Sequence, residues 1–156
     1  MKGREILDSF KKEFGKALLE SRIEQNGKIR YDVVWLKVDR GNLIKAVRHL
    51  FKFGFPHFVV ISANDFESKL EMVYEFSLGW GQSEGEILVN IKVDVPKDDL
   101  VIDTISSVVP GALVSEREKQ EFLGLKIRGI PDNRNFFLPE DFKGHPWVKS
   151  DKEGVE

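Results

Sequence analysis

The chain has 156 residues, of which 41% are hydrophobic and 32% are charged, so it is long enough for one domain with a buried core. Its formal net charge of −2, with both signs interspersed, argues against a nucleic-acid-binding protein. The chain has no cysteine, which excludes disulfides, cysteine nucleophiles and thiolate-bound zinc or iron–sulfur clusters.

The N-terminal stretch MKGREILDSFKKEF is amphipathic, and we predict no signal peptide from it. No apolar run approaches the ~20 residues that cross a bilayer, so a cytoplasmic location is expected. Abundant Lys and Glu, beside only 2 methionines, indicate a thermophile.

Residues 3–20 predict an amphipathic helix. Its apolar positions are Ile6, Leu7, Phe10, Phe14, Ala17 and Leu18. This stripe favours core packing over a membrane surface, because the polar face mixes acids with bases. IEQNGK, at 23–28, is typical of a turn, and YDVVWLKV, at 31–38, predicts a strand.

Asp39 predicts the cap of a second helix, which Gly54 ends and Pro56 prevents from continuing. The expected apolar stripe of that helix consists of Leu43, Ile44, Val47, Leu50 and Phe51.

Three further strands are expected. HFVVISAN, at 57–64, is a nearly continuous apolar run and predicts a buried strand. Residues 69–76 and 86–95 alternate apolar and polar side chains, with a glycine-rich hairpin loop between them. Because both strands are half-buried by this pattern, we expect one sheet face to be solvated or covered by a partner.

Pro96 ends the last of these strands, and Asp98 or Asp99 predicts the cap of a short helix through Ile105. Further along, Ser115 and Glu118 have the spacing of a capping box at the start of another helix.

Gly124 predicts the end of that helix, and LKIRGI, at 125–130, predicts a brief strand. The order of elements predicts an α+β fold of two layers, with a mixed, mainly antiparallel sheet and helices on one face. Residues 1–128 form this domain, and residues 129–156 form an extended tail without periodicity.

The tail is rich in aromatic side chains, which a disordered segment would lack. These are Phe136, Phe137, Phe142 and Trp147. Each ring buries roughly 150–250 Å² when it is covered, so a cover is expected. Either the tail folds back over its own sheet, or it lies on another subunit, where aromatic anchors are favoured.

A family resemblance adds to this interpretation. The matching residues are Glu116-Arg117-Glu118, Gly124, Gly129, Pro131-Asp132, Arg134, Leu138-Pro139-Glu140-Asp141 and Gly144-His145-Pro146. The pattern resembles the C-terminal signature of the thirty-kilodalton subunit of NADH dehydrogenase, the C subunit of respiratory complex I. It covers about a quarter of the chain, and the strands at 57–64 and 69–76 resemble the family's middle sheet more loosely.

Two departures stand out. The chain has Gln120-Glu121-Phe122-Leu123 where the family usually has Tyr-Asp-Met-Phe, and it lacks the Arg that usually follows Gly-His-Pro. Such drift resembles the homologous subunit of archaeal membrane-bound hydrogenases and related ferredoxin-linked complexes. The sequence leaves the branch open.

The resemblance implies a non-catalytic subunit of the hydrophilic arm, with no active site, cofactor or metal of its own. It would pack against the large catalytic subunit, which is related to [NiFe] hydrogenase large subunits, and against the iron–sulfur subunit. We then expect a peripheral location on the cytoplasmic side of the membrane, without direct membrane insertion and without nucleic acid. The expected partner-binding residues are Glu116, Arg117, Glu118, Arg134, Phe136, Phe137, Pro139, Asp141, Phe142, Gly144, His145, Pro146, Trp147 and Lys149.

Catalytic and metal-binding roles are less well supported by the same residues. Glu116, Arg117 and Glu118 could form a catalytic cluster, but acids at a helix start fit the helix dipole better. The resemblance implies that Arg117 makes a forked contact to a carboxylate, either of this chain or of the partner. His145 follows Asp141 by four residues, yet a third metal ligand is missing.

The loop GWGQSEG, at 79–85, lacks the Lys-Ser/Thr of a phosphate-binding loop. Trp80 within it is expected either to contact a second neighbour or to pack on the sheet edge.

The alternative function is an independent small α+β enzyme or ligand-binding domain. That alternative predicts a concave pocket with convergent polar groups and a monomer that works alone.

Overall fold

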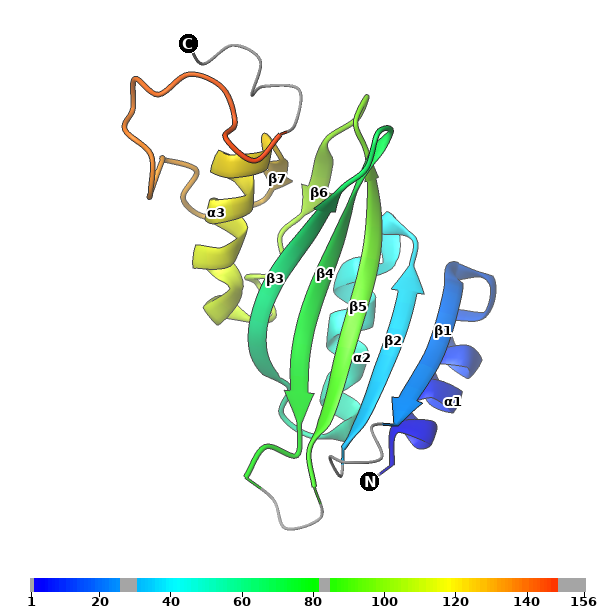
Figure 1. Cartoon of the computed structure of the whole chain (residues 1–156). Helices are drawn as coiled ribbons and strands as arrows, with labels where there is room; N and C mark the ends of the chain where they lie inside the picture. The colour runs from blue at the N-terminus through cyan, green and yellow to red at the C-terminus, as the bar shows by residue number, and fades with distance from the viewer. Residues whose placement is uncertain (1, 26–30, 82–84, 149–156) are drawn as a thin grey trace.

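A five-stranded sheet with helices along one face forms the centre of this computed structural model (Figure 1). Its strand order is β1-β2-β5-β4-β3, in which β2 and β5 are parallel and the other neighbours are antiparallel. The strands are β1 (Leu18–Gln25), β2 (Asp32–Val38), β3 (His57–Asp65), β4 (Lys69–Leu78) and β5 (Ile87–Pro96). The structure describes residues 2–25, 31–81 and 85–148. The predicted α+β class and mainly antiparallel sheet are confirmed.

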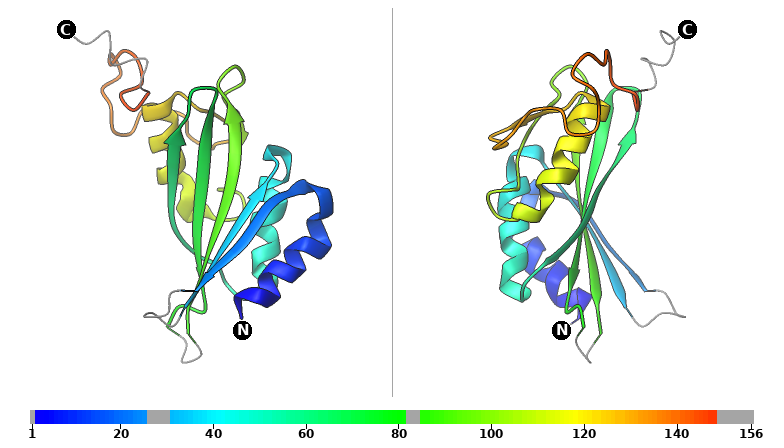
Figure 2. Two further views of the ribbon diagram at one scale, coloured as in Figure 1. Left: turned by 45° about the vertical axis from the view of Figure 1, so that its right-hand side comes forward. Right: turned by 90° about the vertical axis from the view of Figure 1, so that its left-hand side faces the viewer.

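The helices of the described chain lie on one side of the sheet and leave its opposite face uncovered (Figure 2). They are α1 (Gly3–Phe14), α2 (Leu43–Leu50) and α3 (Leu113–Leu123). Single 3₁₀ turns are η1 (Gly15–Ala17), η2 (Arg40–Asn42), η3 (Phe51–Phe53) and η4 (Pro110–Ala112). A separate two-stranded parallel sheet pairs β6 (Val101–Asp103) with β7 (Lys126–Arg128). None of the helices described is long and apolar enough to cross a membrane.

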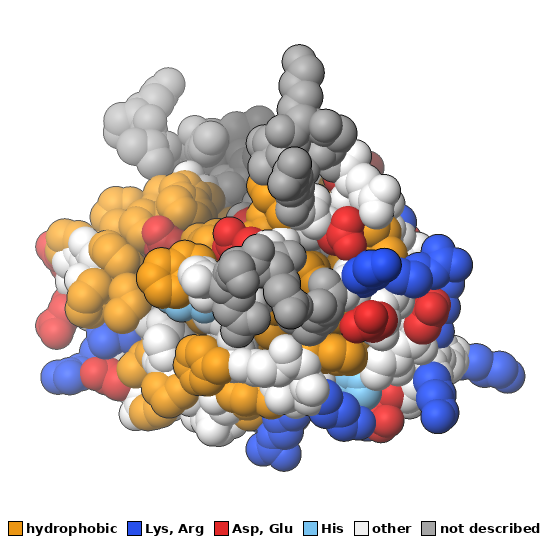
Figure 3. All heavy atoms as spheres, turned by 90° about the horizontal axis from the view of Figure 1, so that it is seen from below, with side chains coloured by type: hydrophobic (Ala, Val, Ile, Leu, Met, Phe, Trp, Pro, Cys, Tyr) orange, Lys and Arg blue, Asp and Glu red, His pale blue; other side chains and the backbone are white. Residues whose placement is uncertain are grey.

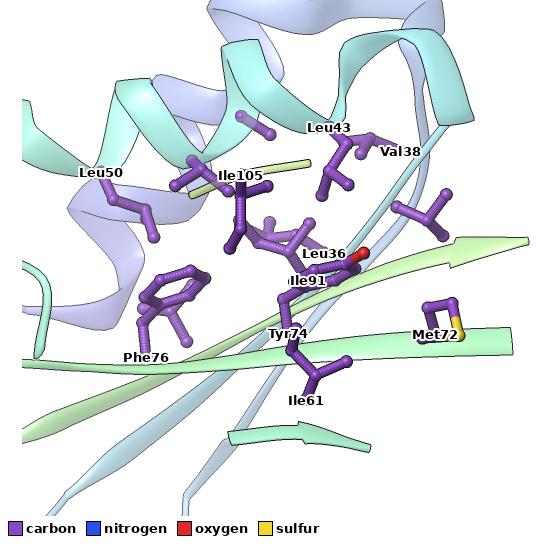
Figure 4. Close-up of a cluster of buried hydrophobic side chains, with 14 of the residues drawn as sticks. Leu36, Val38, Leu43, Leu50, Ile61, Met72, Tyr74, Phe76, Ile91 and Ile105 are labelled. Carbon is purple, nitrogen blue, oxygen red and sulfur yellow. The ribbon is translucent and has the colours of Figure 1, made fainter. Parts of the chain in front are cut away.

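The alternation predicted for the two central strands places one face of each in the core. Leu70, Met72, Tyr74 and Phe76 of β4 are buried. Figure 4 shows the last three among side chains of α2 and of the neighbouring strands. Figure 4 also shows Ile105, from the segment after β6, in this cluster. Burying such side chains contributes about 1.5–3 kcal/mol each, so the sheet and its helices are stabilised by one continuous apolar layer.

The other sheet face is polar, as the alternation predicted. Lys37 of β2 lies 3.0 Å from a carboxylate oxygen of Asp94 and 3.5 Å from one of Glu71. Lys92 and Lys69 complete the network, at 2.8 Å from Glu71 and 2.6 Å from Asp94. Burial opposes the charge on Lys37, but these carboxylates raise its pKa above the ordinary value.

Both predicted boundaries of the second helix are confirmed. The Asp39 carboxylate accepts the N–H of Gly41 at 2.9 Å, at the start of the 3₁₀ turn that leads into α2. Gly54 follows η3 with a φ of 117°, which side chains rarely adopt. Within the predicted stripe, Phe51 is exposed, and Ala46 occupies the buried position instead.

The first prediction that is wrong concerns residues 15–25. The helix ends at Phe14, the chain turns at Gly15 (φ 49°), and β1 begins at Leu18. The strand LLESRIEQ escaped detection because it lies at the sheet edge, where charged residues alternate on its exposed face. Residues 26–28 of the predicted turn lie outside the described part of the chain.

The strand predicted as buried at 57–64 is also placed differently. β3 forms the other edge of the sheet, and Val59 and Val60 are exposed. Its pairing with β4 shifts by one residue between Phe58 and Val60, which is a β-bulge. An apolar run alone does not separate a central strand from an edge strand.

The short helix predicted from Asp98 or Asp99 through Ile105 is absent; its place is taken by β6. Arg40 holds the entry to β6 by donating to the carbonyl oxygens of Asp99 and Val101, at 2.8 and 2.9 Å. A three-residue strand is too short for its periodicity to be recognised.

The capping box predicted at Ser115 and Glu118 is also wrong, because α3 begins two residues earlier, at Leu113. Pro110 instead starts the preceding 3₁₀ turn, where its missing N–H costs nothing. The predicted helix end is confirmed: Gly124 has a φ of 72°, and its N–H bonds to the Gln120 carbonyl oxygen.

Glu116 ties α3 to the segment after β6. Its carboxylate is buried and accepts hydrogen bonds from the Thr104 hydroxyl at 2.5 Å and the Ile105 N–H at 2.7 Å. Burial raises the pKa of Glu116 above its ordinary value of 4.5, although these two hydrogen bonds oppose the shift.

Because the folded chain holds this proton more tightly than the unfolded chain, the contribution of Glu116 to stability is present at low pH and is lost as pH rises above about 4.5. The substitution Glu116→Gln removes the titration. We expect the free energy of unfolding of the variant, relative to the natural chain, to increase as pH rises from 4.5 to 7. Urea unfolding at several pH values measures this difference, and parallel pH profiles would contradict it.

Candidate partner-binding surface

The described part of the tail, residues 129–148, contains no helix or strand and lies against α3 (Figure 1). It leaves β7, passes beside α3 and returns to the last turn of that helix, where the Trp147 N–H donates to the Phe122 carbonyl oxygen at 3.0 Å. Residues 129–148 therefore do not fold back over the five-stranded sheet.

The carboxylate of Glu121 anchors the middle of the tail. It accepts the backbone N–H groups of Phe136, Phe137 and Leu138, the last two at 2.8 and 2.9 Å. Burial alone would raise the pKa of Glu121, but the three N–H donors lower it below the ordinary value. Hydrogen bonds to an ionised acceptor are about twice as strong as neutral ones, so this carboxylate fixes three consecutive residues.

Arg117 holds the segment just before. Its Nε and Nη2 donate to the carbonyl oxygen of Arg134 at 3.2 and 2.7 Å, and its Nη1 lies 3.6 Å from the Asp132 carboxylate. The guanidinium also lies over the Phe136 ring, 4.9 Å from its centroid. The forked contact expected of Arg117 is thus made to a backbone carbonyl group, with the carboxylate beside it.

The far end of the tail docks on the last turn of α3. His145 Nδ1 lies 2.9 Å from the carbonyl oxygen of Glu121, and the Trp147 ring stacks on Phe122 with centroids 4.5 Å apart. A Cβ at Gly124 would lie 2.7 Å from the His145 ring, so only glycine fits there. The same glycine ends the helix and admits the tail.

Four aromatic rings of the anchored tail remain accessible in the isolated chain. Phe136, Phe137, Phe142 and Trp147 are 54%, 48%, 44% and 44% exposed. We call these four rings the tail surface. Hydrogen bonds hold the backbone of the residues that carry these rings. About half of the surface of each of these residues is left uncovered by the described residues.

The structure separates the other predicted contact residues into groups. Those exposed beside the tail surface are Arg134, Pro139, Asp141, Gly144 and His145, with Pro146 partly exposed. Glu116 is buried within the chain, so it is not available to a partner, and Glu118 pairs with Lys119. Lys149 lies outside the described residues.

Sequence reasoning missed Glu121 and Phe122 as the organisers of this surface. The signal was present, because both residues lie in the tetrapeptide that departs from the family pattern. Lys119, whose ammonium lies 5.0 Å from the centroid of the Trp147 ring, was missed as well.

Hydrophobic side chains also gather at the opposite end of the molecule (Figure 3). Phe55, between η3 and β3, and Trp80, just after β4, are 77% and 70% exposed. The Trp80 ring stacks on His57, with centroids 5.7 Å apart, beside the hairpin between β4 and β5. Trp80 therefore packs on the start of β3 and still presents most of its surface; residues 82–84 of its loop lie outside the described part.

Among the described residues, no three His, Asp or Glu side chains are grouped as metal ligands. The glycine-rich loop at 79–85 connects two antiparallel strands, whereas a dinucleotide-binding loop leads from a strand into a helix.

The fold and the tail surface define a small α+β protein that presents a preformed aromatic surface. The model of the family described as the respiratory-chain NADH dehydrogenase 30 kDa subunit matches residues 36–154. The chain belongs to this family.

Relatives from several complexes match most of the chain. It is 30% identical to the beta subunit of the membrane-bound hydrogenase of Pyrococcus furiosus, covering 99% of the chain and 88% of the relative. It is 31% identical to the C subunit of the NADH-quinone oxidoreductase of Moorella thermoacetica, covering 76% and 79%. Further relatives include one from Thermus thermophilus, which agrees with the composition typical of a thermophile.

Two solved structures share the fold. One is a chain in the membrane-bound sulfane sulfur reductase, an archaeal respiratory membrane complex, with a TM-score of 0.66 and 21% identity over 88% of this chain and 75% of that chain. The other is the trypsin-resistant fragment (1-134) of Nqo5, with a TM-score of 0.63 and 22% identity over 85% of this chain and 99% of that chain.

Replacing the anchor tests how the tail is held. We expect Glu121→Ala to release residues 136–138 and to weaken tail docking by about 2–3 kcal/mol, because three charge-assisted hydrogen bonds are lost. In the natural chain, the lowered pKa of Glu121 makes this docking complete above pH 4.5 and weaker as pH falls below it. NMR of the backbone amides of Phe136, Phe137 and Leu138 follows both effects.

Asp141→Ala, in the same tail but outside these hydrogen bonds, serves as the control. Unchanged amide signals of residues 136–138 in Glu121→Ala would contradict the anchoring role.

Proposed function

We propose that the chain is a non-catalytic subunit in the hydrophilic arm of a complex-I-related membrane oxidoreductase. In this proposal it braces the large catalytic subunit, of the [NiFe]-hydrogenase type, and the iron–sulfur subunit. One observation carries the proposal: the four rings of the tail surface stay half exposed although the backbone beneath them is fixed. Family membership and relatives that are named as subunits of such complexes support it.

A pre-organised tail lowers the cost of binding. A flexible strap loses conformational entropy when it docks, whereas a pre-organised one does not. Arg117, Glu121 and the Phe122 ring hold the tail before any partner arrives. Aromatic side chains, phenylalanine included, are enriched in the buried cores of protein interfaces.

A brace needs contacts in two places. The tail surface lies at one end of the molecule, and the exposed Phe55 and Trp80 lie at the other (Figures 1 and 3). We propose that residues 129–156 bind the first neighbour and that Trp80 contacts the second. The chain would then lie peripherally at the cytoplasmic side of the membrane as part of the complex, and it would supply contacts rather than an active site.

Phe142→Ala tests the tail surface, because this ring makes none of the ring–ring contacts that hold the tail to α3. We expect roughly tenfold or greater loss of affinity for the complex, in the range of an aromatic hot spot. The measurement is the amount of the large and iron–sulfur subunits that co-purifies with tagged chain from native cells.

Leu19→Ala, which removes a 55% exposed side chain of β1, is the matched control and should co-purify normally. Thermal unfolding of both variants verifies that the fold is retained. Normal assembly of the Phe142→Ala chain would refute the role of the tail surface.

A further inference from the structure

A cavity of about 790 Å³ lies between the tail and the end of α3. Its lining includes the chain segment 124–130, which contains β7, Val101 of β6, and Asn133, Leu138 and Phe142 of the tail. A volume of this size accommodates several residues of an extended chain or a small ligand.

Among the described residues, no strand pairs with the edge of β7 that faces away from β6. In the parallel β6–β7 pair, Lys126 donates its N–H to the Leu100 carbonyl oxygen at 2.7 Å, and Arg128 accepts the Thr104 N–H at 3.0 Å. Alternate residues of a parallel strand direct both main-chain groups to the same side. The Leu125 carbonyl oxygen and the Ile127 N–H therefore point away from β6.

This edge has the hydrogen-bonding pattern of one missing strand. In a parallel ladder, a single residue of an added strand would donate to the Leu125 carbonyl oxygen and accept from the Ile127 N–H. The Ile127 carbonyl group already accepts the Ile130 N–H, at 3.5 Å, so the open stretch ends there. The edge can thus form two hydrogen bonds with a single residue of an added strand.

Hydrogen bonds to α3 and within the tail hold the part of the tail that lines the cavity. The Gln120 side chain donates to the Asn133 carbonyl oxygen at 3.2 Å, and the Asn135 side chain donates to the Pro139 carbonyl oxygen at 3.2 Å. Together with the Glu121 anchor, these bonds shape the tail as a rigid arch, so the cavity is a built feature of the folded chain.

The side chains of β7 select the character of an added strand. Ile127 is buried on the inner face, whereas Lys126 and Arg128 are exposed on the outer face. Arg128 is already paired with Asp103 at 2.5 Å, while Lys126 has no ion pair with a described residue. A neighbouring strand with an acidic side chain outward and apolar side chains inward would complement this pattern.

We propose that the cavity receives an extended segment of a partner subunit, which adds to the open edge of β7 beneath the tail and carries an acidic residue beside Lys126. This inference rests on the proposed function and specifies how one partner is gripped. Free main-chain groups along an edge are the determinant that strand addition uses. A small ligand would instead require convergent polar side chains, and here Glu121 and Gln120 are already engaged by the tail.

Hydrogen exchange of main-chain amides tests the grip directly. The exchange of Ile127 is compared between the free chain and the complex that co-purifies with tagged chain from native cells. We expect at least a tenfold slower exchange of the Ile127 amide in the complex, with little change at Lys16, an exposed residue outside both proposed contact surfaces. Equal exchange of Ile127 in both states would overturn the inference.

Cross-linking identifies the occupant. A photo-reactive amino acid at position 126 or 128 should cross-link to one continuous segment of one partner subunit, at sites two residues apart, because both positions lie on the same strand face. Cross-links to residues 149–156 of the chain itself, to scattered sites, or to no polypeptide would each overturn the assignment. A small molecule that co-purifies in the cavity would do the same.

Reversing the charge of Lys126 tests the proposed acidic neighbour quantitatively. In competition with the natural chain, Lys126→Glu should be incorporated into the complex roughly threefold to tenfold less, as expected for a cross-strand charge pair. Lys16→Glu, at an exposed site far from β7, is the matched control and should be incorporated normally. If the complex forms normally but Lys126→Glu behaves like this control, the strand inference fails while the proposed function stands; if no complex forms with the natural chain, both fail.

Discussion

The carboxylate of Glu121 is the interaction on which the proposed surface depends. It is buried at the end of α3, and three backbone N–H groups of the tail converge on it. A segment without helix or strand has no regular partners for its main chain, so a single ionised acceptor that satisfies three donors replaces a turn of secondary structure. The arch of the tail, the exposure of its rings and the cavity beneath it all follow from this anchor.

The rest of the fold positions that carboxylate. Gly124 ends α3 at the point where His145 and Trp147 dock, and Glu116 fixes the start of the helix to the segment that follows β6. The helix is held against the sheet through the apolar layer that the β4 side chains share with Ile105. The apolar core between the sheet and the helices thus supports the Glu121 carboxylate, which lies at the periphery of that core.

Much of this architecture could be predicted from alternation and from glycine and proline positions. The central strands, the second helix, the Gly124 stop and β7 agreed with prediction, because burial imposes a regular pattern on central elements. The elements that were missed or misplaced lie at edges: β1 and β3 border the sheet, and β6 has three residues. An edge strand pairs on one side only and is solvated on the other. Its amino-acid composition therefore does not show whether it belongs to a sheet.

The candidate site was predictable in part. The aromatic tail and its family signature identified the region, and the half-exposed rings agree with a surface that another polypeptide covers. The role of Glu121 was not predictable, since it depends on where an aperiodic chain returns in space. Glu116 illustrates the converse: its signature suggested a contact residue, but its carboxylate lies inside the protein, bonded to Thr104 and Ile105.

The contacts that hold the tail have a consequence for assembly. Each of them joins residues close together along the chain: Glu121 reaches 15 to 17 residues ahead to the tail amides and 24 residues ahead to His145. Short loops close at small entropic cost and fast. The tail surface can therefore form within the chain itself, without a partner to template it.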